Sequence, residues 1–287
     1  MSSQHRQSAH LSLLAAGFLY GASSPLARYI GTWLSPFSVV LVRFVFALPL
    51  ALLTFNKNDF RNIPKQKLVL FGVLFPISVS LYTLSLFNTK ISLAIFSFYI
   101  ANLMSSIIAG KLIFSEKLSF TKITGFTVAL IAVITLTHPF DTGFVVDLGM
   151  ILGYLSGIIA TIASVFQKQL TKVMHESSLT FVQVISGILV AGIFVMSVGD
   201  RSIMSLSPEG ILLSMIFGVI FFLINYLMIY GFKHAEIGTG TLLLSSELVF
   251  GPLLAFFVFH ETLGIYEIVG GVLVVAATVI VALENPR

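Results

Sequence analysis

The chain has 287 residues, of which 57% are hydrophobic and only 10% are charged, and its formal net charge is +4. Soluble domains have roughly a quarter of their residues charged, so this composition excludes a soluble globular fold. The absence of cysteine from the chain excludes a disulfide framework, a thiolate metal site and cysteine redox chemistry.

Long apolar runs separated by short polar breaks fill almost the whole sequence. Each run has the roughly 20 residues that a helix needs to cross a bilayer. The runs lie at 11–30, 36–55, 68–87, 91–113, 120–137, 148–168, 178–198, 210–232, 237–259 and 264–283. They predict an all-α integral membrane protein with ten transmembrane helices. We divide it into a first five-helix repeat at 1–137, a connecting loop at 138–147 and a second five-helix repeat at 148–287.

An internal echo supports this division. The segment 113–119 (IFSEKLS) is echoed at 258–264 (VFHETLG), and each of the two segments connects one apolar run to the next. Gly17 in the first run and Gly157 in the sixth are related in a similar way, and each belongs to a series of small residues that lets helices approach closely. Because each half holds an odd number of spans, the two repeats are predicted to have inverted orientation, as in many transporters.

Lys and Arg are concentrated on one side of this topology. Twelve of the sixteen fall on the side that carries both termini: Arg6, Lys57, Arg61, Lys65, Lys67, Lys111, Lys117, Lys122, Lys168, Lys172, Lys233 and Arg287. Only Arg28, Lys90 and Arg201 fall on the other side. Because cytoplasmic loops are enriched in these residues, both termini are predicted to be cytoplasmic, in a multi-pass protein of the bacterial inner membrane. The basic charge therefore reflects topology, and we expect the lipid bilayer and no nucleic acid as a partner.

Glu247 is the clearest candidate for a functional side chain. It lies near the middle of the run at 237–259, where an ionisable group costs about 2.5 to 3.5 kcal/mol on insertion scales and so needs a partner or a purpose. The shift between the echoed segments places Asn102 at the same depth in the first repeat. The pair predicts two spans that line a shared cavity, in which Glu247 binds a substrate amine or exchanges a proton. The alternative is a protonated carboxyl that only bonds a neighbouring helix.

Other polar residues in the spans could complete the walls of this cavity. They are Tyr99, Asn225, Tyr226, Tyr82, Ser80 and Ser246. Aromatic rings with hydroxyl tips suit an amphipathic solute, although these residue types also serve as hydrogen-bonding contacts between helices.

Arg43 lies inside the second span, too deep for an ordinary loop charge. It could bind a substrate carboxylate, or it could pair structurally with a carboxylate or with helix-end carbonyls. Gln183 is its approximate counterpart in the second repeat and carries no charge.

The two glutamates of the echo, Glu116 and Glu261, lie at the membrane interfaces. Each could act as a gate, or could pair with a nearby cation or cap the next helix. No catalytic or metal-binding motif is present, so we expect neither an enzyme nor a cofactor.

The echoed segments resemble the EamA-type branch of the drug/metabolite transporter superfamily. The resemblance spans 11–283 and is carried by Tyr20-Gly21-Ala22-Ser23, Ser35-Pro36 before Arg43, Lys111 to Glu116 before Gly125, Leu244 to Leu248, and Phe259 to Glu261 before Gly270. It implies a five-helix unit duplicated into ten helices, and export or exchange of small metabolites. The family often has proline directly after the position of Glu247. Here Leu248 follows and Pro252 comes one turn later, which predicts a displaced kink.

These observations predict a transporter of a small polar or amphipathic metabolite, most consistent with an amino-acid-like one. It would work by alternating access, with protons as a candidate coupling ion. Nucleotide-linked or methyl-donor metabolites remain alternative substrates. A polytopic sensor or assembly protein without transport is the rival from another class, and a lipid-modifying enzyme is a weaker third.

Overall fold

The computed structural model describes residues 3–61, 63–89, 91–137, 146–250, 253 and 264–282. These residues form helices and contain no strand. The α-helices are α1 (Ser3–Ile30), α2 (Pro36–Thr54), α3 (Lys65–Asn88), α4 (Ile91–Phe114), α5 (Phe120–Thr137), α6 (Leu148–Leu170), α7 (Glu176–Ser197), α8 (Pro208–His234), α9 (Ile237–Leu244) and α11 (Ile265–Ala282). Two short 3-10 helices cover Lys57–Phe60 and Ser202–Ser205.

Six of these helices are long and apolar enough to cross a membrane: α2, α3, α4, α6, α7 and α8. The apolar parts of α5, the α9 region and α11 are shorter, and α1 extends its apolar run backwards by several polar residues to Ser3. The structure therefore confirms an all-helical, multi-pass membrane protein. The count of ten spans stays a prediction, since residues 254–263 lie outside the described part of the chain.

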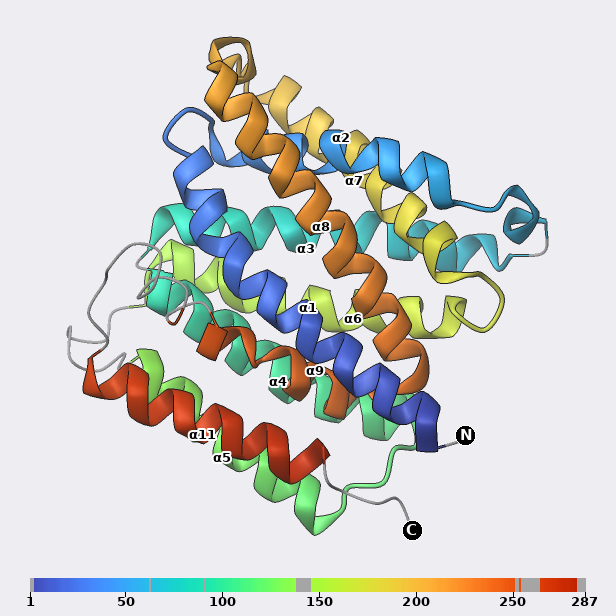
Figure 1. Ribbon diagram of the computed structural model, residues 1–287, viewed down its shortest axis with the longest axis vertical. Helices are drawn as coiled ribbons and strands as arrows, with labels where there is room; N and C mark the ends of the chain where they lie inside the picture. The colour runs from blue at the N-terminus through green and yellow to red at the C-terminus, as the bar shows by residue number, and fades with distance from the viewer. Residues whose placement is uncertain are drawn as a thin grey trace.

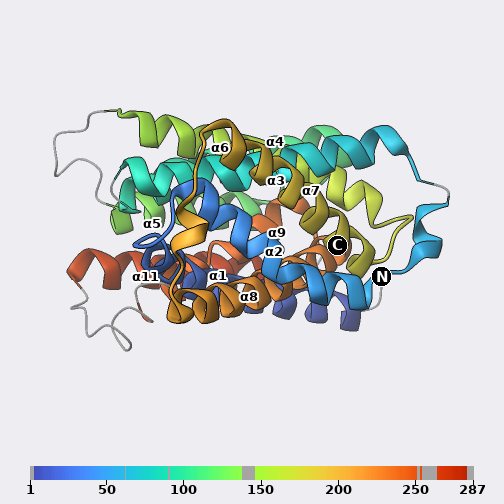
Figure 2. The same cartoon turned by 90° about the horizontal axis from the view of Figure 1, so that it is seen from above.

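The helices run between two ends of the bundle (Figure 1). We call the end where α1 begins and α11 ends the termini face, and the opposite end the distal face. Equivalent helices of the two repeats run in opposite directions: α1 ends at the distal face, whereas α6 starts there (Figure 1). The repeats also interleave. α3 and α4 pack on α6, α1 packs on α8, and α5 pairs with α11. In Figure 2, α3, α4 and α6 lie on one side of the bundle and α1, α8 and α11 on the other.

Polar caps explain where several helices start. The side chains of Ser35, Asp147 and Ser207 accept hydrogen bonds from the free backbone N–H groups of the first turns of α2, α6 and α8. Proline follows Ser35 and Ser207 at the first helical position, where its missing N–H costs nothing. These caps lie at the ends of apolar runs, which is why the predicted starts at 36 and 148 are correct.

Gly17 and Gly157 make the close contacts that their small-residue series predicted. A Cβ on Gly157 would overlap the carbonyl oxygen of Phe98 and approach the Asn102 nitrogen to 3.0 Å. A Cβ on Gly17 would overlap Ser246 Oγ and lie 3.2 Å from the Leu244 oxygen. α6 therefore touches α4 backbone to backbone, and α1 touches the segment after α9 in the equivalent way.

The predicted run at 237–259 is not a continuous α-helix. α9 ends at Leu244, Ser245 and Ser246 form a turn, and the chain is helical again from Glu247 to Phe250. The Ser245 N–H is shared between the Thr241 and Leu242 oxygens, and the Ser246 N–H donates to the Leu243 oxygen, three residues earlier. Ser245 Oγ also donates to the Leu242 oxygen, at 2.6 Å. Serine side chains that compete for backbone carbonyls commonly bend helices. The distortion thus lies directly before Glu247. Pro252, where a displaced kink was expected, lies outside the described residues.

Asp200 ties two loops together at the distal face. Its carboxylate accepts hydrogen bonds from the hydroxyls of Ser35 and Ser38 at the start of α2, and from the Ser202 N–H. Burial raises the pKa of Asp200, but these hydrogen bonds outweigh it and lower the pKa to about 2. The loop before α2 is thereby joined to the loop between α7 and α8.

Replacing Asp200 with alanine is expected to reduce the free energy of unfolding by about 1 to 2 kcal/mol, because a charged acceptor of several hydrogen bonds is lost. The pKa of Asp200 is lower in the folded state than its usual 3.8. The stabilisation is therefore complete above about pH 4 and disappears as the pH falls towards 2. Thermal unfolding of wild type and variant in detergent should show a difference at pH 7 that shrinks at pH 3. An equal difference at both pH values would contradict this role.

Candidate functional site

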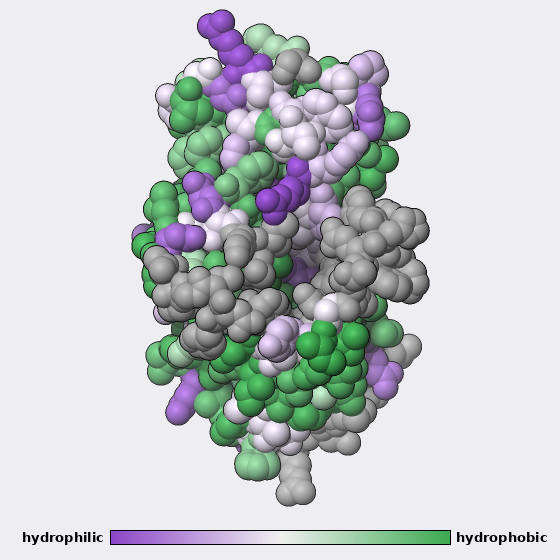
Figure 3. Space-filling view, turned by 90° about the vertical axis from the view of Figure 1, so that its left-hand side faces the viewer, coloured by the Kyte–Doolittle hydropathy of each residue, from purple (hydrophilic) through white to green (hydrophobic). Residues whose placement is uncertain are grey.

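A cavity of about 130 Å³ lies between the two repeats. One buried water needs roughly 10 to 15 Å³ measured in this way, so the cavity can hold a small solute. Its walls come from α1, α2, α3, α4, α6, α8 and the α9 region. Ala27 and Leu86, near the distal ends of α1 and α3, belong to the lining. The cavity therefore extends toward the distal face, which is hollowed near its middle (Figure 3).

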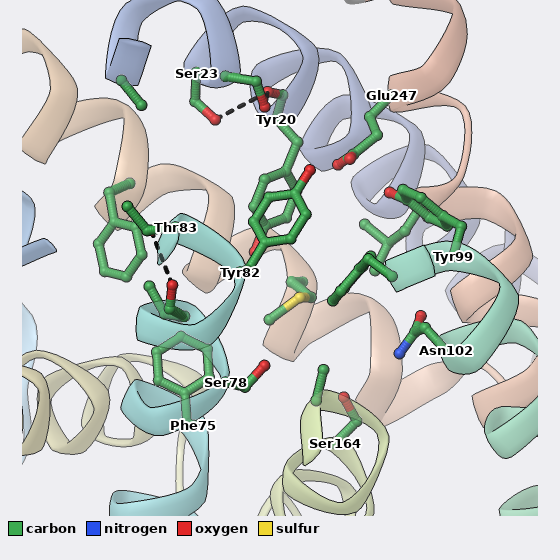
Figure 4. A pocket seen from close by; sticks show the side chains of 18 of the residues that line it. Tyr20, Ser23, Phe75, Ser78, Tyr82, Thr83, Tyr99, Asn102, Ser164 and Glu247 are labelled. Atoms are coloured by element: carbon green, nitrogen blue, oxygen red, sulfur yellow. Dashed lines mark hydrogen bonds between the residues drawn. The ribbon is translucent and has the colours of Figure 1, made fainter. Parts of the chain in front are cut away.

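Five of the predicted site residues line this cavity: Arg43, Tyr82, Tyr99, Asn102 and Glu247. They come from both repeats. The hydroxyl groups of Tyr82 and Tyr99 point toward the carboxylate of Glu247, whereas Asn102 lies on the opposite side of Tyr99 (Figure 4). Asn102 and Glu247, which the shift between the repeats relates to each other, thus both lie in the walls of one cavity.

Asn102 and Glu247 differ in their partners. The Asn102 side chain donates to the Gly157 oxygen at 3.2 Å and to Thr161 Oγ1 at 3.0 Å, so it is anchored to α6. When Gly157 is matched to Gly17, Thr161 corresponds to Gly21 of the first repeat, which has no side chain to offer. Glu247 forms no ion pair with a described residue. Asn102 is accordingly a contact between helices, and Glu247 is the acidic group presented to the cavity.

Arg43 supplies the positive charge of the cavity. Its guanidinium donates to Thr83 Oγ1 at 3.1 Å and lies over the ring of Phe217, 4.7 Å from the centroid. Its Nε has no hydrogen-bond partner in the described part of the protein, and no described carboxylate lies within ion-pair distance. The alternative of a structural pair with a carboxylate is therefore not seen among the described residues. A hydroxyl and an aromatic face hold the cation instead.

Four predicted site residues lie outside the cavity lining. Ser80 donates to the Pro76 oxygen within α3, and the Asn225 amide donates to the Phe221 oxygen within α8. Ser246 faces Gly17, and Tyr226 stacks on Phe222. The structure does not bring these side chains to the site, because they project from other faces of their helices.

Other lining residues were not singled out as site residues from the sequence. Tyr20 projects from α1 beside Tyr82, and Phe98, Ser164 and Gln167 complete the walls on α4 and α6 (Figure 4). One feature of the sequence could have identified Tyr20 as a lining residue. It follows Gly17 by three residues, so it shares the face of α1 that touches the α9 region.

Comparison with known proteins agrees with this architecture. The model of the EamA-like transporter family matches residues 7–137 and 147–283. A solved crystal structure, titled only as that of a protein, covers 96% of both chains with a TM-score of 0.77 and 17% identity, which shows a shared fold. No curated protein matches the sequence. Two family matches that cover nearly the whole chain, one for each repeat, show that it belongs to the EamA-like transporter family.

Proposed function

We propose that the protein exports or exchanges a small amino-acid-like metabolite, which carries both an amine and a carboxylate and binds in the central cavity. One observation carries this proposal. The cavity holds one carboxylate, Glu247, and one guanidinium, Arg43, on different helices, and the two form no ion pair with each other. A zwitterion that bridges them would satisfy both charges.

Electrostatics favours a substrate of this kind. Each buried charge is costly without a counter-charge, and opposite charges interact more strongly in a low-dielectric cavity than in water. The amine would be held by Glu247 among Tyr20, Tyr82 and Tyr99, whose rings attract cations. The carboxylate would meet Arg43, whose planar guanidinium suits carboxylates. The apolar walls would pack against the rest of the solute.

The proposed mechanism is alternating access, because the two inverted repeats surround one central site. The bundle would lie in a bacterial inner membrane with both termini in the cytoplasm. A proton on Glu247 is the candidate coupling ion, since the same carboxylate can hold either a proton or a substrate amine.

A ligand panel tests the proposal on the purified protein. Amino acids should raise the unfolding temperature, whereas matched amines that lack the carboxylate and matched acids that lack the amine should raise it less. A ligand at 100 times its Kd stabilises the folded state by about 2.7 kcal/mol. Hits would then be tested for uptake into proteoliposomes, with and without a pH gradient.

The panel should also contain nucleotide-linked and methyl-donor metabolites. If one of these metabolites stabilises the protein and is taken up, and amino acids have no effect, the proposed substrate is wrong. The proposed transport activity would still be supported. Stabilisation without uptake of any ligand would favour a sensor.

A further inference from the structure

The segment that joins α4 to α5 reaches across to the second repeat at the termini face. Ser115 adopts a left-handed conformation (φ 53°), and the Glu116 N–H donates to the Gly110 oxygen at 3.0 Å, which turns the chain sharply at the end of α4. Glu116 packs against Gly110, where a Cβ would collide with its carboxylate. The turn therefore aims a buried carboxylate back at the bundle.

This carboxylate caps α9. Glu116 Oε1 accepts from the Ile237 N–H at 2.8 Å, and Oε2 accepts from the Gly238 N–H at 3.4 Å. The residue at the cap position of α9, Glu236, makes no side-chain cap of its own. Two of the free N–H groups at the start of α9, in the second repeat, are thus satisfied by a side chain of the first repeat.

Two lysines complete the connection. Lys168, at the end of α6, lies 3.4 Å from Glu116 Oε1 and donates to the Ala235 oxygen at 2.5 Å. Lys122 of α5 pairs with Glu236 and donates to the Lys117 oxygen at 2.8 Å. We call Glu116, Lys122, Lys168 and Glu236, together with the backbone of 235–238, the latch. The side chains of Glu116 and Lys168 are only 9% and 16% exposed, so water competes weakly for their contacts.

The latch lies next to the cavity, on the side of the termini face. Gln167, the neighbour of Lys168, lines the cavity, and so does Thr241. The Thr241 hydroxyl donates to the oxygen of Ile237 at 3.0 Å, and Ile237 is the residue whose N–H Glu116 binds. One helical turn therefore separates the floor of the cavity from the latch. The same helix leads to Glu247 through the turn at Ser245 and Ser246.

We propose that the latch is the closed gate of the termini face. The cavity opens to this face only when Glu116 releases the first turn of α9, so that α9 and α6 can separate from the first repeat. The role of the latch as a gate rests on the proposed transport function. The position of the gate follows from the contacts described above. The latch connects the two repeats, and it lies at the end of the cavity nearest the termini face.

The absence of cysteine from the chain allows a direct test of this gate. Ser164→Cys places a single thiol on the α6 wall of the cavity. In membrane vesicles of known orientation, a membrane-impermeant maleimide applied at the termini face should label this cysteine slowly. Adding Glu116→Ala should raise the labelling rate from that face at least tenfold, which corresponds to about 1.4 kcal/mol. Glu116→Gln, which keeps an acceptor for the Ile237 N–H but loses the charge, should have an intermediate effect.

Glu176 provides a matched control. It is as buried as Glu116, it lies on the same face, and it pairs with Lys233 at 2.7 Å, but both partners belong to the second repeat. Glu176→Gln should lower the unfolding temperature without raising the labelling rate from the termini face. The gate is overturned if Glu116→Ala lowers stability and leaves labelling unchanged, or if both variants raise labelling equally. No substrate is needed, so this result is independent of the ligand panel.

Discussion

Replacing Glu247 with glutamine is expected to weaken binding of any amine-bearing ligand found in the panel by about 30-fold or more. The amide keeps the shape of the side chain but removes the negative charge, and loss of one partner from a desolvated charge pair costs about 2 kcal/mol or more. The unfolding temperature of the ligand-free protein should change little, because Glu247 forms no ion pair with a described residue and glutamine can still accept the hydrogen bond from Tyr99. Kd from titration and uptake into proteoliposomes are the measurements.

Ser246 provides the control for this experiment. It is adjacent to Glu247 in sequence but faces Gly17 and not the cavity. Ser246→Ala should therefore leave the Kd within about threefold of wild type. Loss of affinity for carboxylate-only ligands in Glu247→Gln, to the same degree as for amines, would show that the variant disturbs the cavity generally. That outcome would remove the proposed role of Glu247 as the amine partner.

Much of the fold could be predicted because the apolar runs are bounded by local signals. The predicted span at 36–55 is observed as Pro36–Thr54, and the span at 148–168 as Leu148–Leu170. Both start at a polar cap that interrupts an apolar run. The break at Ser245 and Ser246 was missed, because serines occur in many unbroken membrane helices. It depends on how their N–H groups and the Ser245 hydroxyl compete for backbone carbonyls.

The site was only partly predictable from the sequence. The depth of Asn102 and Glu247 followed from the repeat, and both line the cavity. Their different roles did not, since they depend on the hydrogen-bond partners that the fold supplies. Asn102 finds Thr161 on α6, whereas the residue that corresponds to Thr161 in the first repeat is Gly21, which has no side chain. Most of the wrongly chosen residues were chosen because the sequence does not show toward which neighbour a side chain on a helix points. Ser80 and Asn225 were chosen for their polarity, but each bonds within its own helix.

The roles of the echoed glutamates depended equally on the fold. The sequence left Glu116 open between a gate, an ion pair and a helix cap, and the structure shows the ion pair and the cap. The capped helix is not the next one in the chain but α9, far away in sequence. Glu261, its counterpart, lies outside the described residues.

Replacing Gly157 with alanine is expected to have the largest effect on stability, a loss of about 3 kcal/mol, at the upper end of what overpacking usually costs. The new methyl group would overlap the Phe98 oxygen and crowd the Asn102 nitrogen, both backbone atoms that cannot turn aside. α6 would have to move away from α4, which weakens the Asn102 bonds to the Gly157 oxygen and to Thr161. Thermal unfolding in detergent measures the loss. Binding of panel hits should weaken too, because Tyr99 lies on the displaced part of α4.

Gly192 provides a control that distinguishes the steric clash at Gly157 from the general effect of replacing a glycine within a helix. It lies within α7, and a Cβ there would meet no atom within 4 Å. Gly192→Ala should therefore be neutral or stabilising by about 0.5 to 1 kcal/mol, the usual gain when alanine replaces a glycine inside a helix. If Gly157→Ala were as harmless as Gly192→Ala, the backbone contact between α4 and α6 would not be what holds the wall of the cavity. Gly17→Ala should fall between the two, since its closest neighbour is the Ser246 side chain, which can move.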